Sequence, residues 1–399
     1  MSHLSVTSPS TRSASTRRRG RLALATAAAV ALGTLGLTAA AAAAADPVPR
    51  TGPADTVQTN LNDLVRTGDF PGVVAAVRGR DGRVRDYTAG VGDLETRAKV
   101  PVNGKVRVGS HTKTFTATVV LQLAGEGRLD LDAPVEKYLP GLIRGNGNDG
   151  REITTRRLLQ HTSGLPEYTN YPSLFEIQHT YFEPRELIDR ALGQKPVFAP
   201  GKGWRYNNTG YVLLGMLVQK VTGRPMGEEV TNRIIKPLGL RDTYWPGVGE
   251  QTIRGAHPNG YHSKTGAPGG ELVKITEMDP SWGWTAGNLV STPRDVNRFL
   301  GALLGGELLK PAQLEQMKRT VEAPGFPAGW SYGLGLMKIP LSCGGHAWGH
   351  GGDISGYETR NGVTEDGRAA TVAVTALPTT DAGAERVNAA LDTALCTQK

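Results

Sequence analysis

Ser110 and Lys113 are the first two residues whose types and spacing could do chemistry. They lie three positions apart at the start of a helix predicted to run to Leu123, so their side chains share one face. The helix is apolar on nearly all sides, which predicts burial, and burial lowers the pKa of a lysine. A neutral lysine can take the proton of a neighbouring serine and so create a nucleophile. The alternative is a surface serine and lysine at a helix start, because this four-residue pattern also arises by chance.

Tyr206 and Asn208 form a second candidate pair, in a loop that precedes a predicted helix over Gly210 to Thr222. A phenol can pass a proton, and an amide can contact both a substrate carbonyl and a lysine ammonium. The alternative is an ordinary turn, since Asn-Asn-Thr-Gly is favourable turn chemistry.

His350, Gly351 and Gly352 form the third candidate and are followed by Asp353. Glycines let a backbone approach a ligand closely, as an oxyanion donor must. The alternative is a glycine-rich loop with an incidental histidine.

Two further matches to catalytic motifs are rejected. Lys264-Thr265-Gly266 lies in a stretch whose composition predicts a loop, whereas the motif it matches belongs on a strand. Gly329 to Gly333 spells Gly-x-Ser-x-Gly, but the residues after it favour a strand over the helix that a nucleophile elbow requires.

Taken in order, the three candidates resemble the serine penicillin-recognising enzymes, in the branch that includes class C β-lactamases and secreted actinomycete D-alanyl-D-alanine carboxypeptidase/transpeptidases. The resemblance covers nearly the whole chain after residue 45. The supporting stretches are Leu158 to Leu165 (LLQHTSGL), Ala199 to Gly201 (APG), Asn259 to Tyr261 (NGY), Tyr332 to Leu336 (YGLGL) and Leu341 to Gly344 (LSCG).

This resemblance implies a mechanism that needs no metal or cofactor. Ser110 attacks the carbonyl and forms an acyl-enzyme, Lys113 takes the serine proton together with Tyr206, and Asn208 orients the substrate. The backbone N–H groups of Ser110 and Asp353 bind the oxyanion.

The same resemblance assigns the remaining roles. Tyr206 protonates the leaving amine with the help of a hydrogen bond towards His350. Gly351 and Gly352 belong to the substrate-binding strand, and Trp282 forms a wall of the pocket. The implied substrate is a peptidoglycan stem peptide ending in D-Ala-D-Ala, with penicillins as inhibitors.

One position departs from the pattern of the carboxypeptidase. Met337 stands where that enzyme has an arginine that binds the substrate carboxylate, and Lys338 faces the other way on the next strand position. A β-lactamase, an esterase or a D-amino-acid amidase on the same fold therefore remain alternatives. A non-catalytic penicillin or peptidoglycan binder is a further alternative, which the intact Ser110, Lys113 and Tyr206 argue against.

Periodicity places these residues in a mixed α/β fold. Apolar alternation on both sides of Asp81-Gly82 and of Asp366-Gly367 predicts a hairpin near each end of the chain. Residues 134–309 are mostly helical or loop-like. We therefore expect one domain, residues 46–399, with an antiparallel sheet made from both chain ends, flanked by helices and interrupted by a mostly helical insertion.

The first 45 residues are typical of a secretory signal peptide, with a basic start, an apolar middle and an Ala-x-Ala end. A retained membrane anchor is the alternative. The chain has 45 basic and 37 acidic residues, and five of the arginines lie in this segment. The remainder is nearly balanced, so we expect no nucleic-acid partner, no stable membrane span, and a secreted, extracellular monomer.

Cys343 and Cys396 are the two cysteines of the chain. An exported protein meets an oxidising compartment, where an even count favours a disulfide over free thiols. The resemblance implies the same pair, because the secreted carboxypeptidases carry a disulfide between equivalent positions.

Overall fold

The computed structural model describes residues 55–170 and 173–397. The predicted signal peptide, residues 1–45, lies outside the described residues. Within the described ranges no helix combines the length and the apolar character needed to cross a membrane.

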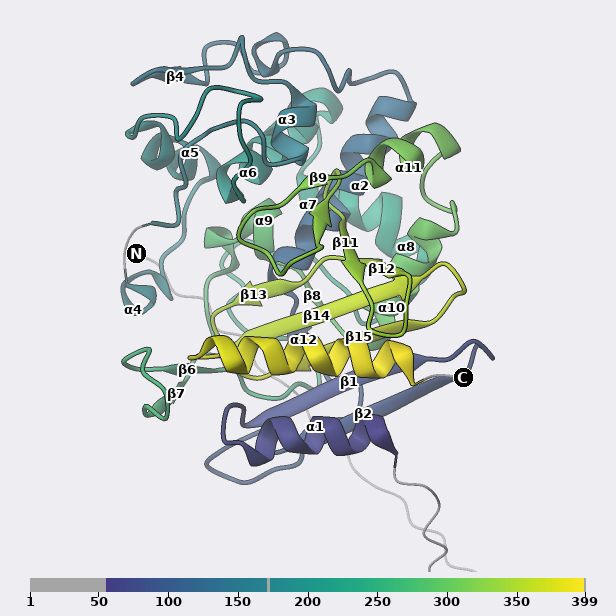
Figure 1. The fold of residues 1–399 in the computed structure, drawn as a ribbon. Coiled ribbons are helices and arrows are strands. Elements are labelled where there is room, and N and C mark those ends of the chain that lie inside the picture. The colour runs from purple at the N-terminus through teal and green to yellow at the C-terminus, as the bar shows by residue number, and fades with distance from the viewer. Residues whose placement is uncertain (1–54, 171–172, 398–399) are drawn as a thin grey trace, which may run out of the picture. The chain divides into compact units, whose positions relative to one another are not determined.

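A nine-stranded antiparallel sheet is built from both ends of the chain, as predicted (Figure 1). The strand order is β2-β1-β15-β14-β12-β11-β10-β9, and β13 pairs with β14. The bounds are β1 Gly72–Arg78, β2 Val84–Gly90, β9 Val321–Glu322, β10 Ser331–Tyr332, β11 Met337–Pro340, β12 His346–Gly349, β13 Gly352–Ile354, β14 Tyr357–Thr364 and β15 Ala369–Val374. The register places Val77 opposite Ala370, so strands from the two chain ends lie side by side.

The two predicted hairpins join β1 to β2 and β14 to β15. Gly82 and Gly367 have φ of 76° and 85° in these turns. Only glycine adopts such angles without strain, which is why Asp-Gly predicted both turns correctly.

The two faces of the sheet pack against different helices. Val73, Ala75 and Val77 face α1 (Thr56–Arg66) and α12 (Asp381–Cys396), which lie side by side across one face in Figure 1. Val74 points to the other face, where α10 (Pro293–Leu304) packs against β1, β14 and β15. This alternation is the period-two pattern of a strand buried on both sides.

The middle of the chain forms a helical region, most of which lies in the upper part of Figure 1. Its helices are α3 Thr155–Leu159, α4 Leu174–Ile177, α5 Pro184–Leu192, α6 Asn208–Thr222, α7 Met226–Val230, α8 Lys236–Leu238, α9 Trp284–Gly287 and α11 Pro311–Lys318. The short strands outside the large sheet are β3 Val106–Arg107, β4 Arg144–Gly145, β5 Asn148–Asp149, β6 Tyr261–Ser263, β7 Leu272–Lys274 and β8 Val290–Ser291. Helix α10 lies within residues 134–309 but packs on the sheet. The bounds 134–309 therefore remain an approximate prediction for the helical insertion.

Helix α2 (Thr112–Gly125) runs through the middle of the molecule and is buried at every residue from Thr112 to Leu121. Two of its threonines donate hydrogen bonds to neighbouring segments: Thr114 to the Gly335 carbonyl at 2.9 Å and Thr116 to the Thr285 carbonyl at 2.8 Å. Buried hydroxyls require such partners, and these bonds fix the position of α2 between the sheet and the helical region.

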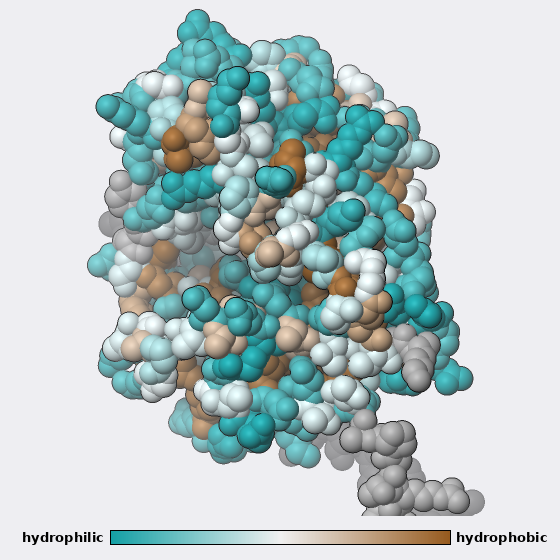
Figure 2. Space-filling view, in the orientation of Figure 1, coloured by the Kyte–Doolittle hydropathy of each residue, from teal (hydrophilic) through white to brown (hydrophobic). Residues whose placement is uncertain are grey.

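The molecular surface is mostly hydrophilic on the face shown in Figure 2, where apolar patches are separated by polar ones. Large apolar side chains that are exposed come from scattered segments of the described chain: Val84, Val102, Phe175, Tyr181, Val197 and Val248.

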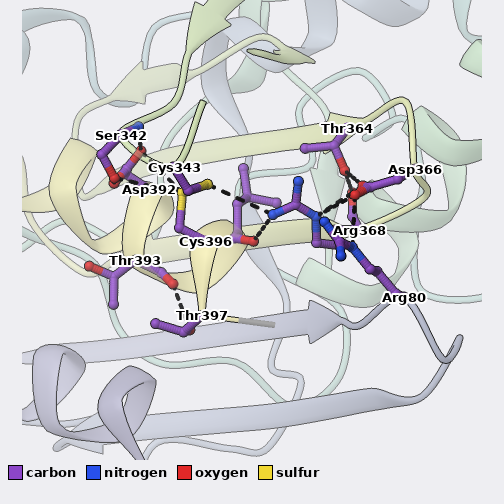
Figure 3. The surroundings of a disulfide bond; sticks show 11 residues. Arg80, Ser342, Cys343, Thr364, Asp366, Arg368, Asp392, Thr393, Cys396 and Thr397 are labelled. Atoms are coloured by element: carbon purple, nitrogen blue, oxygen red, sulfur yellow. Dashed lines mark hydrogen bonds and ion pairs between the residues drawn. A yellow bond between two sulfur atoms is a disulfide. The ribbon is translucent and has the colours of Figure 1, made fainter. Parts of the chain in front are cut away.

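A disulfide joins Cys343, just before β12, to Cys396 at the end of α12, as predicted (Figure 3). Beside it, Arg368 donates to the Leu395 carbonyl at 2.6 Å and pairs with Asp366 at 2.9 Å. The bond therefore ties the C-terminal helix to the strand that leads into the His350 segment.

Replacing both cysteines by serine should lower the free energy of unfolding by about 2–4 kcal/mol, because the crosslink spans 53 positions and restricts the unfolded chain. Urea unfolding of the wild-type protein and of the Cys343→Ser/Cys396→Ser variant measures this, with reduced wild-type protein as the control. Identical unfolding midpoints and slopes would contradict the expectation.

Candidate active site

Ser110 and Lys113 lie together where α2 begins. Ser110 is half-buried in a 3-10 turn, Gly109–His111, that leads directly into the helix, and Lys113 lies in the first helical turn. Lys113 Nζ donates to Ser110 Oγ at 3.0 Å. The spacing of three residues therefore brings the two groups together as the sequence predicts.

The Lys113 amine is buried and has two more partners. Nζ donates to Asn208 Oδ1 at 2.7 Å and to the Ala286 carbonyl of α9 at 2.8 Å. The residue is 0% exposed, and burial lowers its pKa to about 7, although the carboxylates of Glu167 and Asp353 act in the opposite direction. A neutral amine is thus available near neutral pH to accept the serine proton.

Tyr206 lies next to this pair: its ring centroid is 4.9 Å from Lys113 Nζ. Burial raises the pKa of its phenol well above the ordinary value, and the nearby Ser110 hydroxyl lowers that pKa only in part. The phenol oxygen has no hydrogen-bond partner of good geometry among the described residues. Tyr206 therefore stays protonated and is suited to donate or relay a proton, whereas Lys113 is suited to accept one.

Asn207 and Asn208 have different tasks at the start of α6. Asn207 is the N-cap: its Oδ1 accepts from the Gly210 amide at 2.8 Å, and its Nδ2 donates to the Leu165 carbonyl at 3.0 Å. The segment is therefore a capped turn as well as part of the site. The Asn207 cap fixes the start of α6 and so positions Asn208 beside Lys113.

Glu167 is a site residue that the sequence analysis does not identify. Its carboxylate accepts from the backbone amides of Asn208 at 2.6 Å and Thr169 at 3.2 Å. Burial raises the pKa of Glu167, while these amides and Lys113 lower it. The signal available was its place directly after the Leu158 to Leu165 stretch, but a single acid in a loop carries no spacing pattern.

His350 occupies the site differently from the prediction. It lies between β12 and β13, is 0% exposed, and its Nε2 shares a hydrogen bond with the Tyr332 hydroxyl at 2.9 Å. The expected hydrogen bond to Tyr206 is absent, and the two ring centroids are 6.2 Å apart. Burial lowers the pKa of His350 well below its ordinary value, so this histidine is neutral. Its Nε2 contact is with Tyr332, so it packs beside the catalytic groups and does not bond to them.

Strand β13 passes against the turn that carries Ser110. A Cβ on Gly352 would lie 1.9 Å from the Val108 carbonyl oxygen, and one on Gly109, where φ is 51°, would lie 3.0 Å from the Asp353 backbone. Both positions need glycine because two backbones meet there. This contact brings the Asp353 backbone to the serine, as an oxyanion donor requires.

A pocket of about 330 Å³ opens beside these groups and is lined by Ser110, Asn208 and Asp353. Trp282 lines it as predicted, with Tyr168, Leu174, Ile177 and Ile354 among the other walls. No lysine or arginine is among the described lining residues. The described part of the chain also holds no cluster of three or more histidine, cysteine or acidic side chains that could bind a metal ion.

The rejected motifs lie elsewhere. Lys264 is 61% exposed in the β6–β7 hairpin, 3.5 Å from Glu271. Ser331 lies on β10 and is followed by β11, so no helix follows it. Met337 is buried on β11 and packs with Tyr332.

The chain belongs to the beta-lactamase family, whose model matches residues 57–395. A curated relative is Penicillin-binding protein 4* of Bacillus subtilis, 27% identical over 315 residues, which are 76% of this chain and 67% of that protein. The chain covers 42% of the length of several staphylococcal relatives.

Two solved structures are also similar. A D-stereospecific amidohydrolase from Streptomyces sp. is 40% identical with a TM-score of 0.76, and the match covers 84% of this chain and 97% of that one. A D-amino acid amidase from Ochrobactrum anthropi SV3 is 29% identical with a TM-score of 0.76, covering 85% and 96%. The protein is thus a serine hydrolase of the family of β-lactamases and penicillin-binding proteins.

Lys113→Arg should slow acylation of the enzyme by about 10²–10⁴-fold, because a guanidinium does not deprotonate and cannot serve as a general base. The measurement is the rate at which a p-nitrophenyl ester modifies the protein, followed by intact mass. Lys264→Arg is the matched control and should react like the wild type. Equal rates for the two variants would contradict the assignment of Lys113.

Proposed function

We propose that this chain is an amidohydrolase that releases D-amino acids from their amides, esters or short peptides through an acyl-enzyme on Ser110. The observation that carries the proposal is the Glu167 carboxylate, which accepts a hydrogen bond from the backbone amide of Asn208, a residue that lines the pocket. The two similar solved structures, a D-stereospecific amidohydrolase and a D-amino acid amidase, support the same class and the D preference.

Glu167 is suited to bind the free ammonium of a substrate. Two backbone amides fix its carboxylate, and the side chain lies between Asn208 and Thr169, both of which line the pocket. A carboxylate that is partly desolvated and already oriented pairs well with a cation. A substrate with an unblocked α-amine would therefore place its carbonyl near Ser110.

The catalytic steps follow from the protonation states. Lys113 accepts the Ser110 proton as Oγ attacks the substrate carbonyl, and the N–H groups of Ser110 and Asp353 stabilise the oxyanion. The proton then passes from Lys113 to the leaving amine, either directly or through the Tyr206 hydroxyl. Water then attacks the acyl-enzyme and gives its proton to Lys113. That proton returns to Ser110 Oγ as the acid is released, which restores the free enzyme.

The charges near the pocket support an uncharged leaving group. The Asp353 carboxylate lines the pocket, no basic residue is among the described lining, and Met337 is buried. A peptide ending in a free carboxylate would find no cationic partner in these walls. An amide or ester leaving group meets no such difficulty.

D-Ala-D-Ala carboxypeptidase activity on peptidoglycan stem peptides, with β-lactam binding, is the second candidate. Its support is the similarity to Penicillin-binding protein 4* and the motif resemblance over the whole domain. A class C-like β-lactamase or an esterase would use the same Ser110 chemistry. The signal-like residues 1–45 and the disulfide support secretion into an oxidising compartment, where we expect a monomer.

Substrate comparison separates these candidates. D-phenylalanine amide should be hydrolysed at least about tenfold faster than its L enantiomer and than a blocked peptide ending in D-Ala-D-Ala. The blocked peptide has no α-ammonium for Glu167 and its leaving group carries a carboxylate, whereas the expected D preference follows the two similar enzymes. Ammonia and D-alanine release are measured, with Ser110→Ala as the blank. Faster turnover of the D-Ala-D-Ala peptide would favour the carboxypeptidase.

Glu167→Gln should raise KM for D-phenylalanine amide by about 10–100-fold, because a charge-assisted contact to the α-ammonium is worth about 1.5–3 kcal/mol. An ester of N-acetyl-D-phenylalanine is the matched control substrate, since it has no ammonium, and its KM should change little. Equal changes for both substrates would contradict the ammonium role.

A further inference from the structure

Arg360 and Glu358 lie on β14 beside strand β13, and the mechanism above does not use them. The register pairs Asp353 with Glu358 and Gly352 with Thr359. Directly paired residues point to the same face, as do residues two positions apart, so Asp353, Glu358 and Arg360 share one face. Glu358 is 0% exposed, and the Arg360 side chain is 14% exposed.

The Arg360 guanidinium is held by contacts on several sides. Nη1 is 2.6 Å from Asp353 Oδ1, and Nη2 is 2.5 Å from Glu358 Oε1. Nε donates to Asn388 Oδ1 of α12 at 3.0 Å. These partners hold the guanidinium cation next to β13, the strand whose backbone packs against the turn that carries Ser110.

Gly351 shows how closely the guanidinium approaches this backbone. A Cβ on Gly351 would lie 3.0 Å from Arg360 Nη1. The guanidinium therefore rests against the main chain of the segment that leads to Asp353, and a larger residue at Gly351 would push it away.

The need for a cation here follows from Asp353. The residue whose N–H faces the developing oxyanion also carries a carboxylate, and a negative charge so close opposes the charge that forms in the transition state. A bound guanidinium offsets that carboxylate. Burial raises the pKa of Glu358, which favours its neutral form and leaves the guanidinium to offset the Asp353 carboxylate.

We propose that Arg360 is a positioning residue for the oxyanion site: it neutralises the Asp353 carboxylate and holds β13 so that the Asp353 N–H can bind the oxyanion. This inference rests on the proposed Ser110 acyl-enzyme mechanism. Because the oxyanion exists only in the transition state and intermediate, loss of Arg360 affects kcat more than KM.

A double-mutant cycle tests the inference. Arg360→Gln should lower kcat for D-phenylalanine amide by about 10–100-fold while KM changes less than about threefold. In the Asp353→Asn background, where there is no carboxylate to neutralise, the same substitution should lower kcat less than about threefold. An equal loss in both backgrounds would overturn the inference and leave Arg360 with a purely structural role.

Controls keep the result readable if Arg360→Gln folds poorly. Arg360→Lys keeps a cation and should retain more kcat than Arg360→Gln, and the fold of each variant is checked by circular dichroism. If Arg360→Gln does not fold, Arg360→Met, which also removes the cation, takes its place in the cycle with Asp353→Asn, and absence of coupling again overturns the inference. If the wild type does not hydrolyse the amide, the proposed function fails, but the cycle is still measured on acylation by a p-nitrophenyl ester.

Discussion

The desolvation of Lys113 is the constraint on which the rest of the structure depends. A solvated lysine stays protonated far above neutral pH, so the amine can act as a base only if the protein removes water from it. That requirement explains why α2 is buried on all sides, with the Gly335 turn between β10 and β11 against one side and α6, α9 and α11 against others. It also explains the Asn208 amide and the Ala286 carbonyl, which satisfy the buried amine without adding a full negative charge.

The site forms where two parts of the chain meet. The 3-10 turn before α2 supplies Ser110, and helices α2, α6 and α9 supply Lys113, Asn208 and the Ala286 carbonyl. The C-terminal part of the sheet supplies Tyr332 on β10, His350 between β12 and β13, and Asp353 on β13. Glycines at 109 and 352 allow the two parts to approach to backbone contact. Because β14 pairs with β15, and β15 pairs with the N-terminal strand β1, the oxyanion side of the site depends on contacts between the two ends of the domain.

The sequence predicted what depends on short spacing. Ser110 and Lys113 are separated by less than one helical turn, the two Asp-Gly hairpins are local, and the motif resemblance located Asn208 and Trp282. It missed Glu167, whose role arises from a loop folded against the start of α6. It also placed the His350 hydrogen bond on Tyr206 instead of Tyr332, because the partner depends on strand register and side-chain packing across the sheet. The role of Arg360 could not be predicted for the same reason, because only the pairing of β13 with β14 brings this residue to Asp353.

The central claim is that Lys113 is a neutral base near physiological pH, and a direct titration tests it best. Protein labelled with ¹⁵N at the lysine side chains is followed by NMR from pH 5 to 10, and the Lys113→Met variant assigns the resonance. The account predicts one lysine with a midpoint at about 7, which is absent from the variant. A Lys113 resonance that titrates above about pH 9 would contradict the account, because Ser110 would then lack its base.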